Sequence, residues 1–171
     1  MWNFIDESFY LEDGVLGMAV GVHQKSKVLY YQPLASKSIY AMHTSSLMDP
    51  FSENLNVMSV LQKESQSAGL IADGMGRLFY SQASQTDVQE WTPQISRHRS
   101  IANDPKRLQF VSDFSIDKQG TLWLVSNKFH KYFNCNFSHN STNMMVLRIP
   151  RAANALYVST WKGPSRTSLC I

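Results

Sequence analysis

The sequence predicts an all-β fold made of about three blades of a β-propeller. Three segments of the 171-residue chain repeat one layout, in which a short apolar strand, a tight turn and a second apolar strand follow one another. Leu29, Leu78 and Leu122 hold equivalent places in the repeats, 49 and 44 residues apart. Propeller blades of four strands take roughly 40–50 residues each, so this spacing fits. No stretch keeps a convincing helical period, although residues 56–63 come near it.

Each repeat opens with a hairpin. Its turn contains Gly, Asp and other polar residues, which favour tight turns between β-forming runs. The predicted hairpin strands are 17–22 and 28–31, then 69–72 and 78–80, then 114–116 and 121–125. Further strands are predicted at 38–42, 88–91, 144–149 and 155–158. We therefore interpret residues 1–171 as one partial propeller domain, with repeats at about 10–50, 60–95 and 105–150 and a C-terminal strand and tail.

Three repeats are fewer than the roughly 4–8 blades of a closed propeller. An unclosed set of blades leaves edge strands bare. The first residues, Met1–Phe4, also lack the basic and apolar regions of a signal peptide. We expect from this that the chain is a truncated part of a longer polypeptide.

The composition argues against nucleic-acid and membrane partners. The net charge is only +3, and the densest basic runs, Arg97–Arg99 and Lys106–Arg107, are short enough to be solvated loops. No apolar run reaches the roughly 18 residues of a membrane span. With 43% hydrophobic, 12% aromatic and 17% charged residues, the chain suits an extracellular β-rich domain.

The residues predict no metal and no cofactor. None of the five histidines forms a pair at metal-ligand spacing, and no phosphate loop or nucleophile elbow is present. Asp73 and Asp117 each begin a hairpin turn, where we expect them to bond the turn backbone. Asp113 would turn toward a ligand only if a β-bulge re-aimed it. His130 is interpreted as a surface or rim residue, or alternatively as a proton carrier near neutral pH.

Four stretches resemble motifs of one known family. They are Glu12–Ala19 (EDGVLGMA), Leu29–Ser36 (LYYQPLAS), Leu108–Asp113 (LQFVSD) and Gly120–Phe129 (GTLWLVSNKF). In this order they resemble the yellow and major royal jelly proteins of insects, over about residues 10 to 160. The N-terminal half of the usual chain is absent, Glu90 stands where many members carry Cys, and Val111 stands where Pro is common.

The resemblance implies a secreted, six-bladed propeller. Members of the family act in cuticle pigmentation and melanin chemistry, serve as nutritive jelly proteins, or bind biogenic amines in the saliva of blood-feeding flies. A fold shared by such different roles does not name the function by itself.

Four residues are the candidate ligand site: Phe110, Ser112, Asn127 and Phe129. If residues 108–112 and 122–129 are extended, Phe110 shares a face with Ser112, and Asn127 shares one with Phe129. Two rings, a hydroxyl and a carboxamide suit an aromatic amine, and the resemblance implies that these positions line the pocket of amine-binding relatives. In the alternative interpretation, both rings are core residues and Asn127 caps a turn.

Two further features bear on the compartment. Cys135 and Cys170 could form one disulfide, which is sensible only in an oxidising compartment. Asn136 and Asn140 begin glycosylation sequons in one polar loop. Together with the resemblance, these features predict a secreted glycoprotein.

Three functions remain open. The first is a binding module that captures a small aromatic amine or a catechol-derived ligand at the propeller mouth without transforming it. The second is an enzyme of melanin formation that converts dopachrome by moving a proton, for which His130 is the local titrating candidate. The third is a structural or nutritive role.

Overall fold

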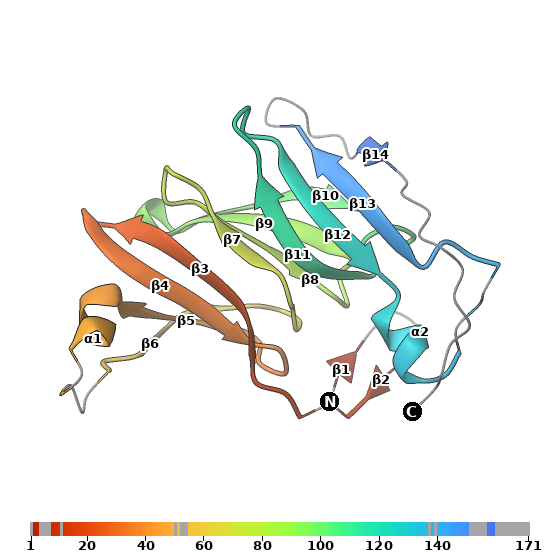
Figure 1. The fold of residues 1–171 in the computed structure, drawn as a ribbon, viewed down its shortest axis with the longest axis horizontal. Helices are drawn as coiled ribbons and strands as arrows, with labels where there is room; N and C mark the ends of the chain where they lie inside the picture. Colours follow the sequence, from red (N-terminus) through yellow and green to blue (C-terminus); the bar gives the residue numbers. More distant parts are fainter. Residues whose placement is uncertain are drawn as a thin grey trace.

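The computed structural model describes residues 2–3, 8–10, 12–49, 51, 55–136, 138, 140–150 and 157–159. These residues form three four-stranded antiparallel sheets that fan out side by side (Figure 1). The predicted all-β class is confirmed, since the helices are single short turns at the ends of strands. No described helix has the length and apolar character needed to cross a membrane.

Each sheet follows the chain from one edge to the other. The first sheet contains β3 (Val15–His23), β4 (Ser26–Pro33), β5 (Ser38–His43) and β6 (Met58–Gln62). The second contains β7 (Leu70–Ala72), β8 (Leu78–Gln82), β9 (Asp87–Thr92) and β10 (Arg97–Asn103). The third contains β11 (Phe110–Ile116), β12 (Leu122–Asn127), β13 (Met144–Ile149) and β14 (Tyr157–Ser159). The remaining elements are a small sheet of β1 (Trp2–Asn3) and β2 (Ser8–Phe9), the helices α1 (Thr44–Met48) and α2 (Phe129–Phe133), and a 3₁₀ turn at Pro93–Ile95.

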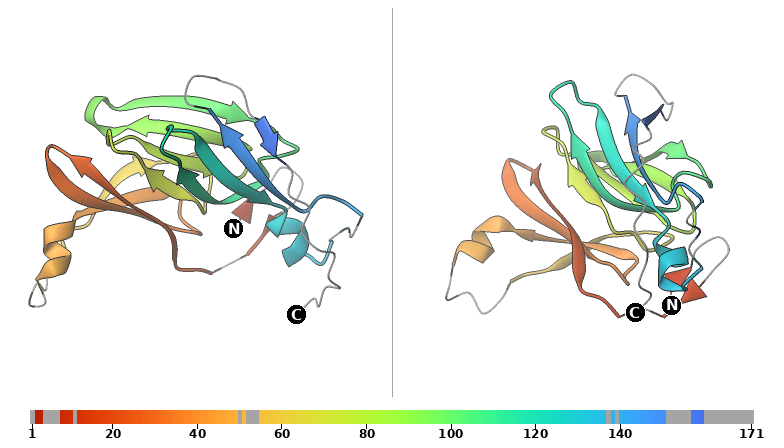
Figure 2. Two further views of the ribbon diagram at one scale, coloured as in Figure 1. Left: turned by 45° about the horizontal axis from the view of Figure 1, so that its top comes forward. Right: turned by 45° about the vertical axis from the view of Figure 1, so that its right-hand side comes forward.

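The first strands of the three sheets are neighbours. β7 lies between β3 and β11, and it contacts both. Figure 2 shows the sheets splaying away from this line of first strands, which is how blades surround a propeller axis.

Two of the three hairpins use the same turn. Asp73 Oδ1 accepts the backbone N–H groups of Met75 and Arg77, both at 2.9 Å, and Asp117 Oδ1 accepts those of Gln119 and Thr121 at the same distances. A glycine with positive φ completes each turn, Gly76 at +76° and Gly120 at +80°, a conformation that other L-residues rarely adopt. The predicted turn-building role of both aspartates is confirmed.

Some expected elements differ. The fourth strands β6 and β10 have no counterpart in the prediction, and residues 56–63 contain β6 rather than a helix. Arg97–Arg99 lies inside β10, so the interpretation of this run as a loop was wrong, although its side chains are exposed as expected. Of the predicted late strand 155–158, residues 155 and 156 lie outside the described part of the chain.

Apolar side chains between adjacent sheets form the core. Val28 and Tyr30 of the first sheet pack with Leu78 and Tyr80 of the second. Phe79 on the opposite face of the second sheet packs in a cluster with third-sheet residues that include Leu122 and Leu124. Because alternate residues of β8 face opposite neighbours, the second sheet is buried on both sides.

Candidate ligand site at the mouth end of the sheets

The mouth end is the end of the sheets where β4, β8 and β12 finish and β11 begins. An apolar cluster gathers there from separate sheets: Leu34, Ala68, Ala83 and Phe110, joined by Phe9, with Phe129 packed against it. The hairpin turns lie at the opposite end of the sheets (Figure 1).

The structure brings Phe110 and Phe129 together. Their ring centroids are 4.9 Å apart at an interplanar angle of 29°, a stacked arrangement. Phe110 is buried and Phe129 is half-buried. Phe9 meets the edge of Phe129 at 6.1 Å and stacks on Phe133 at 4.3 Å.

Asn127 lies beside this stack, because it is the register partner of Phe110 across β11 and β12. Its Oδ1 accepts the backbone N–H of Phe129 at 2.9 Å. This bond ends the strand at Asn127, and α2 begins two residues later. The expectation that residues 122–129 form one extended run was therefore wrong, and Phe129 reaches the site from a helix. The backbone-capping role that the alternative gave to Asn127 is present.

Ser112 lies at a register shift between Val111 and Asp113. The side chain of Ser112 is half-buried and donates to the carbonyl of Val125 at 3.3 Å. The bulge that would re-aim Asp113 is thus present, and it leaves this carboxylate exposed, accepting the N–H of Phe114 at 2.8 Å.

His130 is buried in α2, so its interpretation as a surface or rim residue was wrong. His130 directly follows Phe129 in α2, and its side chain is buried while that of Phe129 is half-buried. Asn136 and Asn140 are exposed, as is Cys135. Cys170 lies outside the described residues, so the predicted disulfide between Cys135 and Cys170 stays a prediction.

A buried lysine at the same end was not foreseen. Lys63 directly follows β6, and its Nζ donates to Gln32 Oε1 and to Ser67 Oγ, both at 2.7 Å. Gln32 in turn donates to the carbonyls of Ala68 and Gly69. Desolvation by burial lowers the pKa of Lys63 to about 7. A single lysine between a strand and a serine-rich connection carries no sequence signal, because only the fold brings Gln32 to it.

A second buried polar group is the carboxylate of Asp87, the first residue of β9 in the second sheet. Asp87 accepts from Gln89 Nε2 at 2.5 Å and from Gln82 Nε2 at 3.3 Å. Burial raises the pKa of the Asp87 carboxyl, and the two amide bonds oppose that rise only in part.

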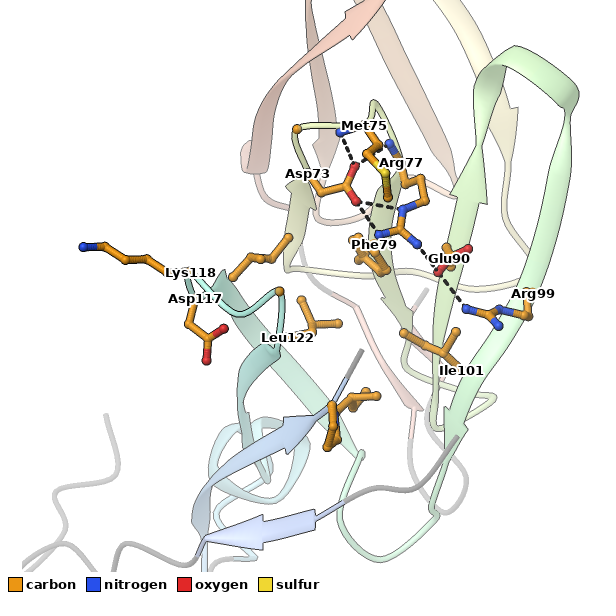
Figure 3. A pocket seen from close by; sticks show the side chains of 15 residues that line it. Asp73, Met75, Arg77, Phe79, Glu90, Arg99, Ile101, Asp117, Lys118 and Leu122 are labelled. Atoms are coloured by element: carbon orange, nitrogen blue, oxygen red, sulfur yellow. Dashed lines mark hydrogen bonds and ion pairs between the residues drawn. The ribbon is translucent and has the colours of Figure 1, made fainter. Parts of the chain in front are cut away.

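An open cavity of about 280 Å³ lies at the other end, between the turns of the second and third sheets. Figure 3 shows Arg77, Glu90 and Arg99 in a chain along one wall; Glu90 accepts from Arg77 at 3.3 Å and from Arg99 at 2.9 Å. The floor is apolar, with Phe79, Ile101 and Leu122. None of the four predicted ligand residues lines this cavity. In the described part of the chain, no group of three His, Cys, Asp or Glu residues could hold a metal ion.

Comparison with known proteins identifies the family. The family model described as "Major royal jelly protein" matches residues 2–156. The chain belongs to this family. It is 28% identical over 167 residues to major royal jelly protein 9 of Apis mellifera. The aligned region covers 85% of this chain and 38% of that relative. It is 20% identical to L-dopachrome tautomerase yellow-f of Drosophila melanogaster, over 73% of this chain and 32% of that relative. It is 22% identical to the yellow-related salivary protein LJM111 of Lutzomyia longipalpis, over 71% of this chain and 32% of that relative. The chain thus spans about a third of the length of these relatives.

Solved structures support the propeller fold. A gluconolactonase of Xanthomonas campestris aligns with a TM-score of 0.64 at 13% identity, over 85% of this chain and 47% of that protein. A streptogramin B lyase aligns with a TM-score of 0.56 at 10% identity, over 90% and 45%. Such neighbours are β-propeller proteins, and this member of the major royal jelly protein family has the fold of an incomplete propeller.

Proposed function

We propose that this chain forms part of a secreted propeller whose mouth binds a small aromatic amine or a catechol-derived ligand without transforming it. The observation that carries the proposal is the stack of Phe110 and Phe129 beside Asn127. Phe129 is half-buried, so part of its surface remains for a ligand ring. An aromatic pair contributes about 0.5–1.5 kcal/mol beyond the area that it buries.

Asn127 can serve both its own helix and a ligand. Its Oδ1 already accepts the N–H of Phe129, and an amide oxygen has a second lone pair. That lone pair suits an ammonium, and the Nδ2 donor suits a ring hydroxyl. Ser112 contributes less than the sequence predicted, since its hydroxyl donates to the Val125 carbonyl.

Calorimetric titration of the chain with dopamine, serotonin and histamine tests this proposal. Phe129→Leu is expected to weaken binding of the aromatic amine several-fold, because the ring that stacks on the ligand is lost. Phe133→Leu is the matched control: it lies in the same helix and also packs on Phe9. Equal losses in the two variants, or normal binding in both with a lower melting temperature, would favour the interpretation of Phe129 as a core residue. Absence of any binding by the unmodified chain would overturn the proposal for these residues.

Dopachrome conversion is the second candidate, favoured by the similarity to a protein named L-dopachrome tautomerase. The reaction moves a proton from one carbon to another atom of the substrate, so it needs a base with a pKa near neutral. Lys63 fits by its pKa of about 7, but Lys63 and His130 are both buried. This burial favours binding over conversion. A dopachrome-decay assay separates the two functions: turnover that Lys63→Met or His130→Gln abolishes would establish the enzyme.

A further inference from the structure

The cavity between the hairpin turns of the second and third sheets has a charged wall and an apolar floor. The wall is the chain of Arg77, Glu90 and Arg99, and the floor includes Phe79 and Leu122 (Figure 3). The cavity lies at a contact between two adjacent sheets, at the end opposite the mouth. A ligand held there is therefore separate from one held at the mouth.

The carboxylates that line the cavity are already bonded within the chain. Asp73 Oδ1 accepts two N–H groups of its turn, and its Oδ2 binds the guanidinium of Arg77 at 2.6 and 2.7 Å. Asp117 likewise accepts two N–H groups of its turn, and its Oδ2 accepts the indole N–H of Trp123 at 2.9 Å. Glu90 is 9% exposed, and its Oε2 accepts from both guanidiniums of the wall. A cationic ligand would have to compete with these donors for each carboxylate.

The unused bonding capacity of the wall belongs to Arg99. A guanidinium carries five N–H donors, and in the described part of the chain Arg99 gives a single bond, from Nη2 to Glu90 at 2.9 Å. Arg77, in contrast, is bonded both to Asp73 and to Glu90. The other cation that lines the cavity, Lys118, points away from the apolar floor (Figure 3). The side chain of Arg99 is 44% exposed, so its remaining donors are accessible to a ligand.

We propose that this cavity binds a small carboxylate with an apolar body, which places its carboxylate on Arg99 and its body on the floor. The guanidinium fork matches a carboxylate, because parallel N–H groups can donate to both oxygens. The cavity volume of about 280 Å³ is that of about nine water molecules in the liquid, so the ligand has about ten non-hydrogen atoms. Phe79, Ile101 and Leu122 offer the body no hydrogen bond, so the floor favours a hydrocarbon over a hydroxylated body.

Titration of the chain with octanoate, followed through the backbone amide signals in nitrogen–proton correlation spectra, tests this inference. The signals of Gly74 and Gly120, which line the cavity, should shift, and that of Asn127 at the mouth should not. Acetate has the carboxylate without the body, and octanol has the body without the charge. Both should bind at least about tenfold more weakly than octanoate, since each buried methylene contributes up to about fourfold and the charged hydrogen bond about tenfold. The result does not depend on what the mouth binds.

A charge-removing variant locates the carboxylate of the ligand. Arg99→Gln keeps an amide that can donate to Glu90 and removes the guanidinium, so octanoate should bind about tenfold more weakly while octanol binds as before. Arg97→Gln is the matched control: Arg97 is an exposed arginine of the same strand, β10, and does not line the cavity. Circular dichroism checks that both variants remain folded.

Four results would overturn the proposal. Octanoate could fail to bind, or its shifts could map away from Gly74 and Gly120. Octylamine, which carries the opposite charge on the same body, could bind at these glycines as tightly as octanoate, and the cavity would then not select an anion. Arg99→Gln and Arg97→Gln could weaken octanoate binding equally, which would indicate a general effect of net charge rather than a site at Arg99.

Discussion

The buried lysine makes a specific prediction about pH and stability. Lys63 is almost completely buried, and no ion pair to it is found in the described part of the chain. Its Nζ instead donates to the neutral oxygens of Gln32 and Ser67. Replacing it with methionine keeps an unbranched chain of similar length and removes the group that titrates. Ser67 still donates to Gln32 Oε1 at 2.8 Å, so that acceptor is not left unbonded.

The size of the effect follows from the pKa values. The folded pKa of Lys63 is about 7, against 10.5 for the unperturbed group. Between these values the unfolded chain binds more protons than the folded chain, so the free energy of unfolding rises with pH. Each unit is worth at most about 1.4 kcal/mol. From pH 7 to pH 9 the wild-type chain should gain about 2 kcal/mol, because the rise is only partial near the folded pKa.

Urea unfolding followed by tryptophan fluorescence at pH 7, 8 and 9 measures this gain, at one fixed protein concentration. Lys63→Met should lack the rise, and Lys106→Met, at an exposed lysine, should keep it. A wild-type stability that is flat or falls over this window would refute the reasoning. So would a Lys63→Met variant with an unchanged slope.

Three further predictions concern the core, the turns and the loop. Leu78→Ala, at a fully buried contact between sheets, should lower the free energy of unfolding by about 2–5 kcal/mol, as measured by urea titration. Leu47 is exposed, so Leu47→Ala is the control, and an equal loss in the two variants would contradict the packing. Asp73→Ala removes the acceptor of two backbone N–H groups and should cost about 1–3 kcal/mol; an unchanged urea midpoint would show that the turn does not need the carboxylate. Secreted from insect cells behind a signal peptide, the chain should carry glycan at the exposed Asn136 or Asn140, and glycosidase should then increase its gel mobility.

Local signals explain what the sequence could predict. The Asp-x-x-Gly turns at Asp73 and Asp117 are encoded within five residues, so the local sequence was enough to predict the hairpins. β6 and β10 are different. Their outward residues are largely exposed and polar, and each is held by pairing with one neighbour only. An edge strand of this kind lacks the alternation that identifies a half-buried strand.

The candidate site was predicted in part for a similar reason. Alternation along a strand places neighbouring residues correctly only while the strand continues. Asn127 accepts a bond from the backbone two residues ahead, and asparagine competes in this way wherever a strand can end. The stack of Phe110 on Phe129 therefore exists, but through a helical turn that the alternation did not anticipate.

The repeat also explains why the candidate ligand residues lie at the mouth end. In the middle of the second strands, Leu78 and Leu122 face the sheet that comes before theirs in the chain and must be apolar, and Leu29 holds the equivalent place in the first sheet. Near the strand ends the residues become polar and differ between sheets: Gln32 donates to the carbonyl of Ala68, Gln82 accepts the backbone N–H of Glu64, and Asn127 accepts that of Phe129. A polar side chain there can bond backbone groups outside the apolar contacts between blades. The blades can therefore keep one packing pattern while the mouth changes its chemistry, which is what a family with several roles on one fold requires.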